Sequence, residues 1–201
     1  MIAILDYDAG NIKSVEKACN KLGAATTVTR DFAEIRKADH VILPGVGSFG
    51  DAMEHLKKYE LDKVIHEVVE NETPFLGICL GLQLLFESSE ETPGVEGLSI
   101  LKGCVKRIPE GKDLKIPHIG WNDLTLQNNG RLFQGFEKNP YVYFVHSYYL
   151  EAEDKSIVKA TTNYGVEIHA SVEEKNVFAC QFHPEKSSDV GLSILKNFME
   201  I

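Results

Sequence analysis

The chain has 201 residues, of which 43% are hydrophobic and 25% are charged, and its formal net charge is −9. These proportions are those of a globular protein with a sizeable core, and the length fits a single domain over residues 1–201. The acidic balance disfavours nucleic acid as a partner, no apolar stretch approaches the roughly 20 residues of a membrane span, and the N-terminus lacks a signal-peptide pattern.

Strands and helices are predicted to alternate through the first part of the chain. Short apolar runs predict strands over residues 2–5, 26–29, 40–43 and 75–78. Apolar residues at helical spacing predict helices over residues 12–22, 31–37, 49–56 and 61–69. This alternation is typical of a mainly parallel sheet with helices on both faces, in which sites form at the carboxyl ends of the strands.

The second half of the chain has weaker helix signals. It predicts short strands, in part antiparallel, over 99–108, 124–126, 142–150, 157–161, 167–172 and 177–182, followed by a last helix over about 189–199. Residues 118–122 contain the only Trp and are interpreted as an aromatic loop, with a core position as the default and a docking surface as the alternative. The predicted fold class is α/β: one domain with a mainly parallel central sheet flanked by helices, and antiparallel strands in the C-terminal half.

Cys79 stands between an apolar strand and the start of an apolar helix, with Gly77 and Gly81 two residues away on either side. Small neighbours permit the sharp strand-to-helix turn of a nucleophile elbow, here with Cys in place of Ser. The N–H groups at the start of the helix favour a thiolate and are placed to bind an oxyanion. The alternative interpretation of Cys79 is a small residue of the core.

A second glycine-containing loop and a distant histidine support the catalytic interpretation. The loop 44–47, P-G-V-G, follows a predicted strand, so its N–H groups lie at the same edge of the sheet as Cys79. His183 ends the predicted strand 177–182, and Glu185 follows two residues later, on the same side if the backbone is extended. Cys79, His183 and Glu185 together predict a nucleophile, a proton carrier and an orienting carboxylate.

The four cysteines lack the C-x-x-C spacing of zinc sites and redox pairs. We therefore expect no metal, no cofactor and no disulfide framework. A reducing, cytoplasmic setting would keep Cys79 as a thiol.

The motifs G-I-C-L-G-L-Q at 77–83 and H-P-E at 183–185 resemble those of the class I (triad) glutamine amidotransferases, and the resemblance covers essentially the whole chain. Members of this family hydrolyse the side-chain amide of glutamine through a γ-glutamyl thioester and deliver the ammonia to a synthase. The segments 6–11, 43–47, 117–122, 143–148 and 181–188 are similar to those of the glutaminases that work with a cyclase subunit, as a heterodimer, in histidine biosynthesis. Sister glutaminases share the triad but not the H-I-G-W-N segment.

The resemblance also implies roles for individual residues. It implies that Cys79, His183 and Glu185 are catalytic. The implied oxyanion donors lie at Leu80 and at Val46 or Gly47. The residues implied to contact glutamine are Gly47, Gln83, His146, Ser147 and Tyr148. The residues implied to face the partner are Asn11, Trp121, Tyr143 and Lys186.

Three alternatives remain open from the sequence: a sister amidotransferase, a stand-alone cysteine hydrolase and a non-catalytic binding subunit. The intact triad argues against the last. An amidotransferase without its synthase would waste glutamine, so we expect the loop 44–47 to be misaligned, and glutamine hydrolysis to be slow, until the partner binds.

Overall fold

The computed structural model describes residues 1–8, 10–111, 114–127 and 129–201. Its main sheet has eight strands in the order β2-β1-β3-β4-β13-β12-β11-β8. These strands are β1 (Ile2–Leu5), β2 (Thr26–Thr29), β3 (His40–Gly45), β4 (Phe75–Cys79), β8 (Thr125–Leu126), β11 (Val158–Asn163), β12 (Glu167–Glu174) and β13 (Val177–Cys180). Pairing is parallel from β2 to β13 and antiparallel from β13 to β8, which confirms the predicted fold class.

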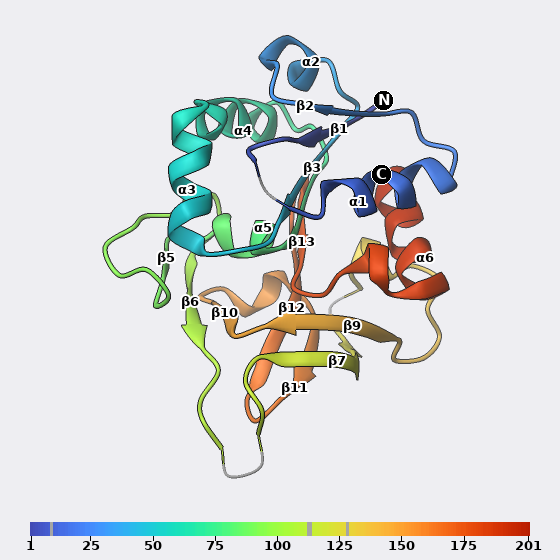
Figure 1. The fold of residues 1–201 in the computed structure, drawn as a ribbon. Helices are drawn as coiled ribbons and strands as arrows, with labels where there is room; N and C mark the ends of the chain where they lie inside the picture. The colour runs from blue at the N-terminus through green and yellow to red at the C-terminus, as the bar shows by residue number, and fades with distance from the viewer. Residues whose placement is uncertain (9, 112–113, 128) are drawn as a thin grey trace.

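Helices cover both faces of the parallel half of this sheet (Figure 1). They are α1 (Ile12–Lys21), α2 (Phe32–Arg36), α3 (Phe49–Lys58), α4 (Leu61–Glu70), α5 (Leu80–Leu84) and α6 (Ser188–Met199). Because successive side chains of a strand point to opposite faces, Leu5 of β1 packs in the cluster of α3 and α4, and Ile4 packs in the cluster of α1 and α6. The first four helices begin and end close to the predicted positions.

Helix boundaries follow from local capping. The carboxylate of Asp31 accepts hydrogen bonds from two backbone N–H groups at the start of α2, and the hydroxyl of Ser48 accepts one from Asp51 at the start of α3. Ser48 thereby fixes where the chain leaves the loop 44–47 and enters α3.

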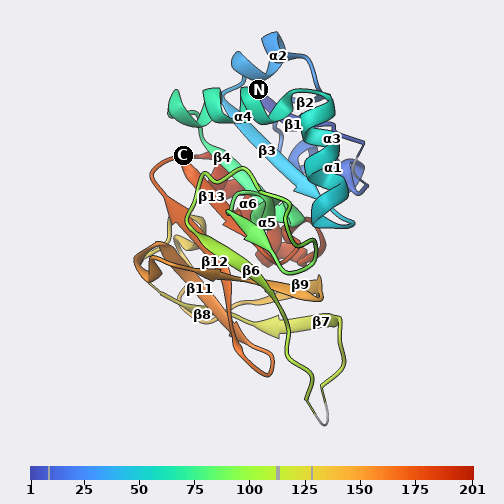
Figure 2. The ribbon, with the colours of Figure 1, turned by 90° about the vertical axis from the view of Figure 1, so that its left-hand side faces the viewer.

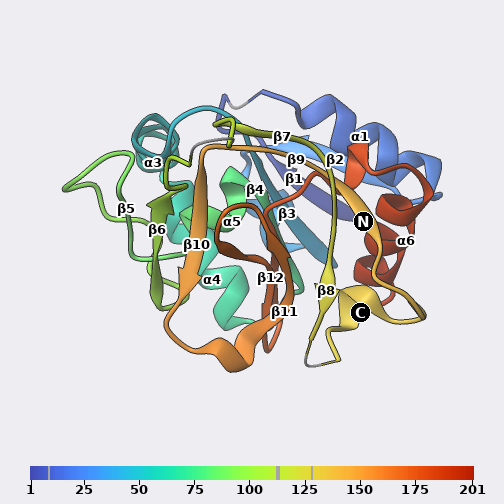
Figure 3. The same ribbon diagram turned by 90° about the horizontal axis from the view of Figure 1, so that it is seen from below.

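Two smaller sheets lie beyond the main one. One pairs β7 (His118–Asp123) with β9 (Tyr141–His146), and the other joins β10 (Tyr148–Ala152), β6 (Gly103–Arg107) and β5 (Ser88–Ser89). Figures 2 and 3 show β7 and β9 side by side, and we call this pair the β7–β9 ribbon. Three short 3-10 helices complete the described elements: η1 (Arg131–Phe133), η2 (Lys155–Ile157) and η3 (Pro184–Lys186).

Two predictions for the second half were wrong in detail. The single strand predicted over 142–150 is two strands, β9 and β10, which belong to different sheets and are separated at Ser147. The segment 118–122 is not a loop but lies in β7, and Trp121 is 52% exposed, so the default core interpretation is wrong. Among the described residues β7 pairs with β9 alone, and Ile119 and Trp121, on one face of β7, are 60% and 52% exposed.

The predicted loop over 6–11 is present, but its residue Ala9 lies outside the described residues. Within the described ranges, no helix has both the length and the apolar character to cross a membrane.

Candidate active site

Cys79 is the last residue of β4, and α5 begins immediately after it. Its φ of 56° and ψ of −108° are strained for a residue with a side chain, a feature that clusters at functional sites. Both flanking glycines are needed: a Cβ on Gly81 would lie 1.9 Å from the carbonyl oxygen of Leu43, and one on Gly77 would lie 2.6 Å from that of Gly81. The sharp strand-to-helix turn predicted from the glycine spacing is therefore present.

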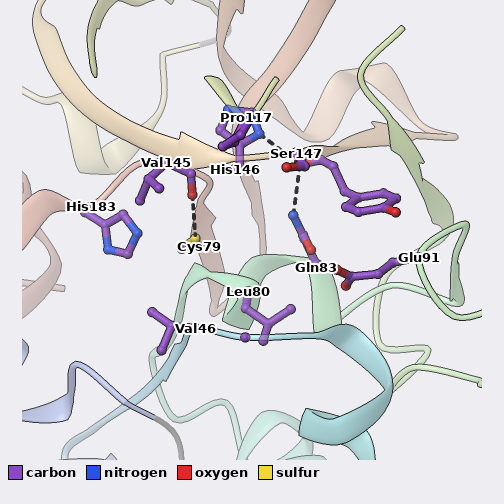
Figure 4. A pocket seen from close by; sticks show the side chains of 12 residues that line it. Val46, Cys79, Leu80, Gln83, Glu91, Pro117, Val145, His146, Ser147 and His183 are labelled. Carbon is purple, nitrogen blue, oxygen red and sulfur yellow. Dashed lines mark hydrogen bonds between the residues drawn. The ribbon is translucent and has the colours of Figure 1, made fainter. Parts of the chain in front are cut away.

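A cavity of about 320 Å³ opens over this turn (Figure 4). It is large enough for a small polar molecule. The lining residues include nine that the sequence analysis singled out: Val46, Gly47, Cys79, Leu80, Gln83, His146, Ser147, Tyr148 and His183. The predicted loop 44–47 begins later than expected, because Pro44 and Gly45 still belong to β3. Val46 and Gly47 reach the cavity because β3 and β4 are parallel neighbours, in register such that Gly45 pairs with Cys79.

His183 and Glu185 form a buried pair beside the cavity. Nδ1 of His183 lies 2.8 Å from Oε1 of Glu185, and both side chains are at most 1% exposed. The contact arises differently from the prediction, because residues 184–186 form η3 rather than extended backbone. Pro184, with its fixed φ, starts this 3-10 turn, and the turn brings the Glu185 carboxylate back to the His183 ring.

Electrostatics favour the protonated form of His183. Burial of the ring lowers its pKa, but hydrogen-bonding and charge interactions with Cys79 and Glu185 outweigh burial and raise the pKa to about 9. Nε2 is buried and has no partner of standard hydrogen-bond geometry among the residues that the structure describes. Because Cys79 is nonetheless close enough to raise the pKa, Nε2 is the atom available to exchange a proton with the sulfur.

The sulfur of Cys79 has two further polar neighbours. Its thiol donates to the carbonyl oxygen of Val145 at 3.9 Å, as Figure 4 shows, and the side-chain amide of Gln181 donates to it from 3.7 Å. Gln181 is fully buried and was not among the predicted site residues. Gln83 contacts Gln181 directly, since Nε2 of Gln83 donates to Oε1 of Gln181 at 3.0 Å. The same Nε2 also donates to the carbonyl oxygen of Tyr148 at 3.0 Å.

His146 and His118 form a second buried pair on the ribbon. Nδ1 of His146 donates to the carbonyl oxygen of Tyr148 at 2.8 Å, so its Nε2 must accept from Nδ1 of His118 at 3.0 Å. Burial lowers the pKa of His118 to about 4 and, as the largest cause, that of His146 to about 3. Both rings are therefore neutral at physiological pH and hold the backbone at Tyr148 in place.

The residues predicted to face a partner fall into two places. Trp121 and Tyr143 are directly paired on the ribbon, and Lys186 is exposed on η3. Asn11 instead touches the buried His183–Glu185 pair: its Nδ2 donates to Oε1 of Glu185 at 2.6 Å.

Glu91 also lines the cavity and was not predicted. Its Oε2 accepts a hydrogen bond from the backbone N–H of Phe49 at 2.7 Å, at the start of α3. Glu91 is the only acidic residue among those that line the cavity in the described part of the chain.

Nowhere in the described ranges do three His, Cys, Asp or Glu side chains gather as ligands of a metal ion would.

Comparison with known proteins identifies the class. Residues 3–201 match the family described as "Glutamine amidotransferase class-I". The fold resembles a crystal structure of a glutamine amidotransferase, with a TM-score of 0.77 at 19% identity over 99% of this chain and 97% of the other. It also resembles PurLQS from Thermotoga maritima, with a TM-score of 0.75 at 20% identity over 99% and 97% of the two chains. The chain belongs to the class-I glutamine amidotransferase family.

Relatives of similar sequence identify a narrower group within this family. The chain is 51% identical to imidazole glycerol phosphate synthase subunit HisH of Moorella thermoacetica, over 100% of this chain and 94% of the relative. It is 50% identical to the subunit of the same name from Caldanaerobacter subterraneus, over 100% and 98% of the two chains. Within its family, the chain is of the HisH type.

Proposed function

We infer that the chain is the glutaminase subunit of an imidazole glycerol phosphate synthase and hydrolyses glutamine to glutamate and ammonia. The observation that carries this proposal is the buried His183–Glu185 pair beside the strained Cys79, with Cys79 and His183 lining one cavity, in a chain about half identical to HisH subunits. Ammonia released here is used by the partner subunit, which we propose to be a cyclase, in histidine biosynthesis. A cytoplasmic setting fits this role.

The reaction is proposed to begin with attack of the Cys79 sulfur on the side-chain amide carbon of glutamine. A C–S bond forms, and the carbonyl oxygen gains the negative charge of a tetrahedral intermediate. Protonated His183 gives a proton to the amide nitrogen, the C–N bond breaks, and ammonia leaves. His183 then takes a proton from water, which attacks the thioester, and the C–S bond breaks to return the electron pair to sulfur and release glutamate.

Glu185 supports the positive charge on His183 during these steps. Its Oε1 faces Nδ1 of the ring, so the other nitrogen, Nε2, is left to face Cys79. A buried carboxylate in this position fixes the ring orientation and favours the imidazolium. The raised pKa of His183 supports its role as the proton donor to the leaving ammonia.

The oxyanion is proposed to be bound by backbone N–H groups at both sides of the elbow. Leu80 begins α5, so its N–H has no partner within that helix. Val46 and Gly47 line the cavity opposite, and Gly47 has a φ of +104°, a conformation that suits glycine. Loss of one such donor typically costs roughly 100- to 1,000-fold in rate.

The cavity wall offers complementary groups for the rest of glutamine. Glu91 places a negative charge where the α-ammonium group of the substrate needs a counterion. Gly47, Ser147 and Tyr148 are proposed to contact the amino-acid end of the substrate, and His146 acts indirectly by holding Tyr148.

The β7–β9 ribbon is the proposed docking surface for the cyclase. Ile119, Trp121 and Tyr141 are large hydrophobic residues that are each at least half exposed on it. Exposed aromatic residues are enriched in the centres of protein interfaces. The ribbon also reaches the active site, because Val145 of β9 contacts Cys79.

The decisive experiment measures glutamate release by the chain alone, with the cyclase subunit, and with the cyclase and its nucleotide substrate. We expect slow hydrolysis by the chain alone and a large increase in the full complex. Labelling of Cys79 by a glutamine-mimicking electrophile should abolish both rates. Equal hydrolysis with and without the partner would contradict gating, and turnover of simple esters without preference for glutamine would contradict the glutaminase assignment.

A further inference from the structure

The side chain of Gln181 is a buried polar group that follows an apolar strand. It directly follows β13, where the neighbouring Cys180 and Phe182 are fully buried apolar residues. Gln181 is itself 0% exposed, and its backbone N–H donates to the carbonyl oxygen of Ala170. A buried amide side chain is costly unless it is hydrogen-bonded, so its partners indicate its role.

Those partners fix the orientation of the amide. Nε2 of Gln83 can only donate, so the atom of Gln181 that faces it at 3.0 Å must be the acceptor, Oε1. The amide nitrogen of Gln181 is then left to point at the sulfur of Cys79, 3.7 Å away.

Gln83 is fixed in its turn. Its two N–H groups are directed to Oε1 of Gln181 and to the carbonyl oxygen of Tyr148, the second of which Figure 4 draws as a dashed line. Both of its donors are used, so only its Oε1 remains for a ligand in the cavity.

The other neighbours of the sulfur cannot replace this donor. The carbonyl oxygen of Val145 accepts from the thiol, but it has no proton to offer once the sulfur is charged. His183 has a donor only while Nε2 is protonated, and in the proposed reaction it gives that proton away. The N–H of Gln181 keeps its proton throughout, and a hydrogen bond to a charged atom is stronger than one to a neutral atom.

We propose that Gln181 donates a hydrogen bond to the charged sulfur of Cys79, both before attack and when the C–S bond of the thioester breaks, and that Gln83 orients Gln181 for this task. The proposal deepens the glutaminase function proposed above and rests on it for the second step. Gln181 thereby contacts a reacting atom, whereas Gln83 acts on the sulfur through Gln181 and is a positioning residue.

The test measures the reactivity of the sulfur without glutamine. The full-length chain carries Cys104→Ser, which removes the half-exposed cysteine, and is alkylated by iodoacetamide across a pH series. Gln181→Met keeps the side-chain length and removes the donor. We expect the pH midpoint of alkylation to rise by about one to two units, the size expected from a hydrogen bond to a charged group.

Gln83→Met tests the positioning role. Gln83→Met keeps Gln181 but removes the hydrogen bond that orients the Gln181 amide. We therefore expect the pH midpoint of alkylation to rise less than in Gln181→Met. Gln127→Met is the matched control, since Gln127 donates to Thr161 on the β8–β11 side of the sheet. We expect it to leave the midpoint unchanged, and circular dichroism with a melting curve confirms that each variant is folded.

Glutamine turnover in the complex with the cyclase supplies the second measurement. Gln181→Met is expected to lower kcat roughly 10- to 100-fold and to change KM less than about twofold. A folded Gln181→Met with an unchanged alkylation midpoint overturns the proposal even if glutamine turnover is normal. If instead the midpoint shifts but no variant of the chain, including wild type, hydrolyses glutamine, the glutaminase assignment fails and the hydrogen bond to sulfur stands.

Discussion

The side chain of Asn11 donates a 2.6 Å hydrogen bond to Oε1 of Glu185, the same atom that faces Nδ1 of His183. The other carboxylate oxygen, Oε2, is buried without a partner among the described residues. Asn11 is thus the second polar contact of the carboxylate that orients His183. It lies at the start of α1 and comes from the opposite end of the chain.

This contact predicts the effect of Asn11→Ala. Without the Asn11 amide, Glu185 loses one of its two hydrogen-bonding contacts. A hydrogen bond to a charged group contributes about 1.5–3 kcal/mol. We therefore expect kcat for glutamine to fall roughly tenfold or more, with KM little changed. Steady-state kinetics in the complex, at saturating cyclase, measure this. Asn20→Ala is the matched control, because the side chain of Asn20, on the same helix, accepts a hydrogen bond from the hydroxyl of Thr26 and none of the described contacts joins it to Glu185. If kcat is unchanged and only cyclase affinity falls, Asn11 acts solely at the interface.

The pKa of His183 predicts the alkaline side of the pH–rate profile. In the proposed reaction His183 must be protonated to release ammonia, so glutaminase activity should decline as pH rises through about 9. Burial lowers this pKa, and interactions with Cys79 and Glu185 raise it. Glu185→Gln removes one of the raising interactions, so the decline should move to lower pH. A decline in Glu185→Gln at an unchanged or higher pH would contradict the proposed pairing.

Trp121 tests the docking surface. Its exposed ring is expected to be buried by the cyclase, and Trp121→Ala should weaken the complex roughly 30-fold, the size typical of an aromatic residue central to an interface. Isothermal titration calorimetry measures the affinity. Val28→Ala removes another exposed apolar side chain, 36% exposed on β2 and away from the ribbon, and should leave the affinity unchanged. Equal affinities for both variants would exclude Trp121 from the interface.

The neutral pair His118 and His146 predicts a loss of stability in acid. Burial keeps the pKa of His146 near 3, whereas a histidine in the unfolded chain has a pKa near 6.5. Below pH 6.5 the unfolded state therefore binds a proton that the folded state does not bind, and this stabilises the unfolded state. The contribution is present above about pH 6.5 and is lost as pH falls, by about 2 kcal/mol between pH 7 and pH 5 for His146.

Urea unfolding of His146→Gln across this range checks the prediction. The variant is expected to be less stable at pH 7 but to lose less stability on acidification than wild type. The exposed His66→Gln should reproduce the wild-type slope. Parallel pH dependences for wild type and His146→Gln would contradict neutral burial of this ring.

Local patterns predicted the parts of the fold that depend on local chemistry. The G-x-C-x-G spacing predicted the turn at Cys79, since packing there leaves no room for a Cβ on Gly77 or Gly81. The helix at α3 followed from Ser48 as its N-cap. These features are set within a few residues of chain.

Features that depend on contacts between residues far apart in the sequence could not be predicted from local patterns. Nothing in the apolar alternation of 142–150 marks Ser147 as the point where the chain changes sheets. The 52% exposure of Trp121 depends on what packs against its face of the β7–β9 ribbon, which the residues of β7 themselves do not reveal. Gln181 could have been found from the sequence, because it is the polar residue in the apolar run 177–182. A polar side chain in a strand that is predicted to be buried indicates a specific hydrogen-bonding role.

The position of β13 in the sheet has a consequence for how activity arises during protein synthesis. β13 follows β12 in the chain, yet it inserts beside β4 and completes the parallel half of the sheet. A nascent chain that extends only to the end of β12 contains Cys79 but lacks His183 and Glu185. We therefore expect a chain that terminates before β13 to hydrolyse no glutamine, because the residues proposed to activate Cys79 are placed beside it only when β13 pairs with β4.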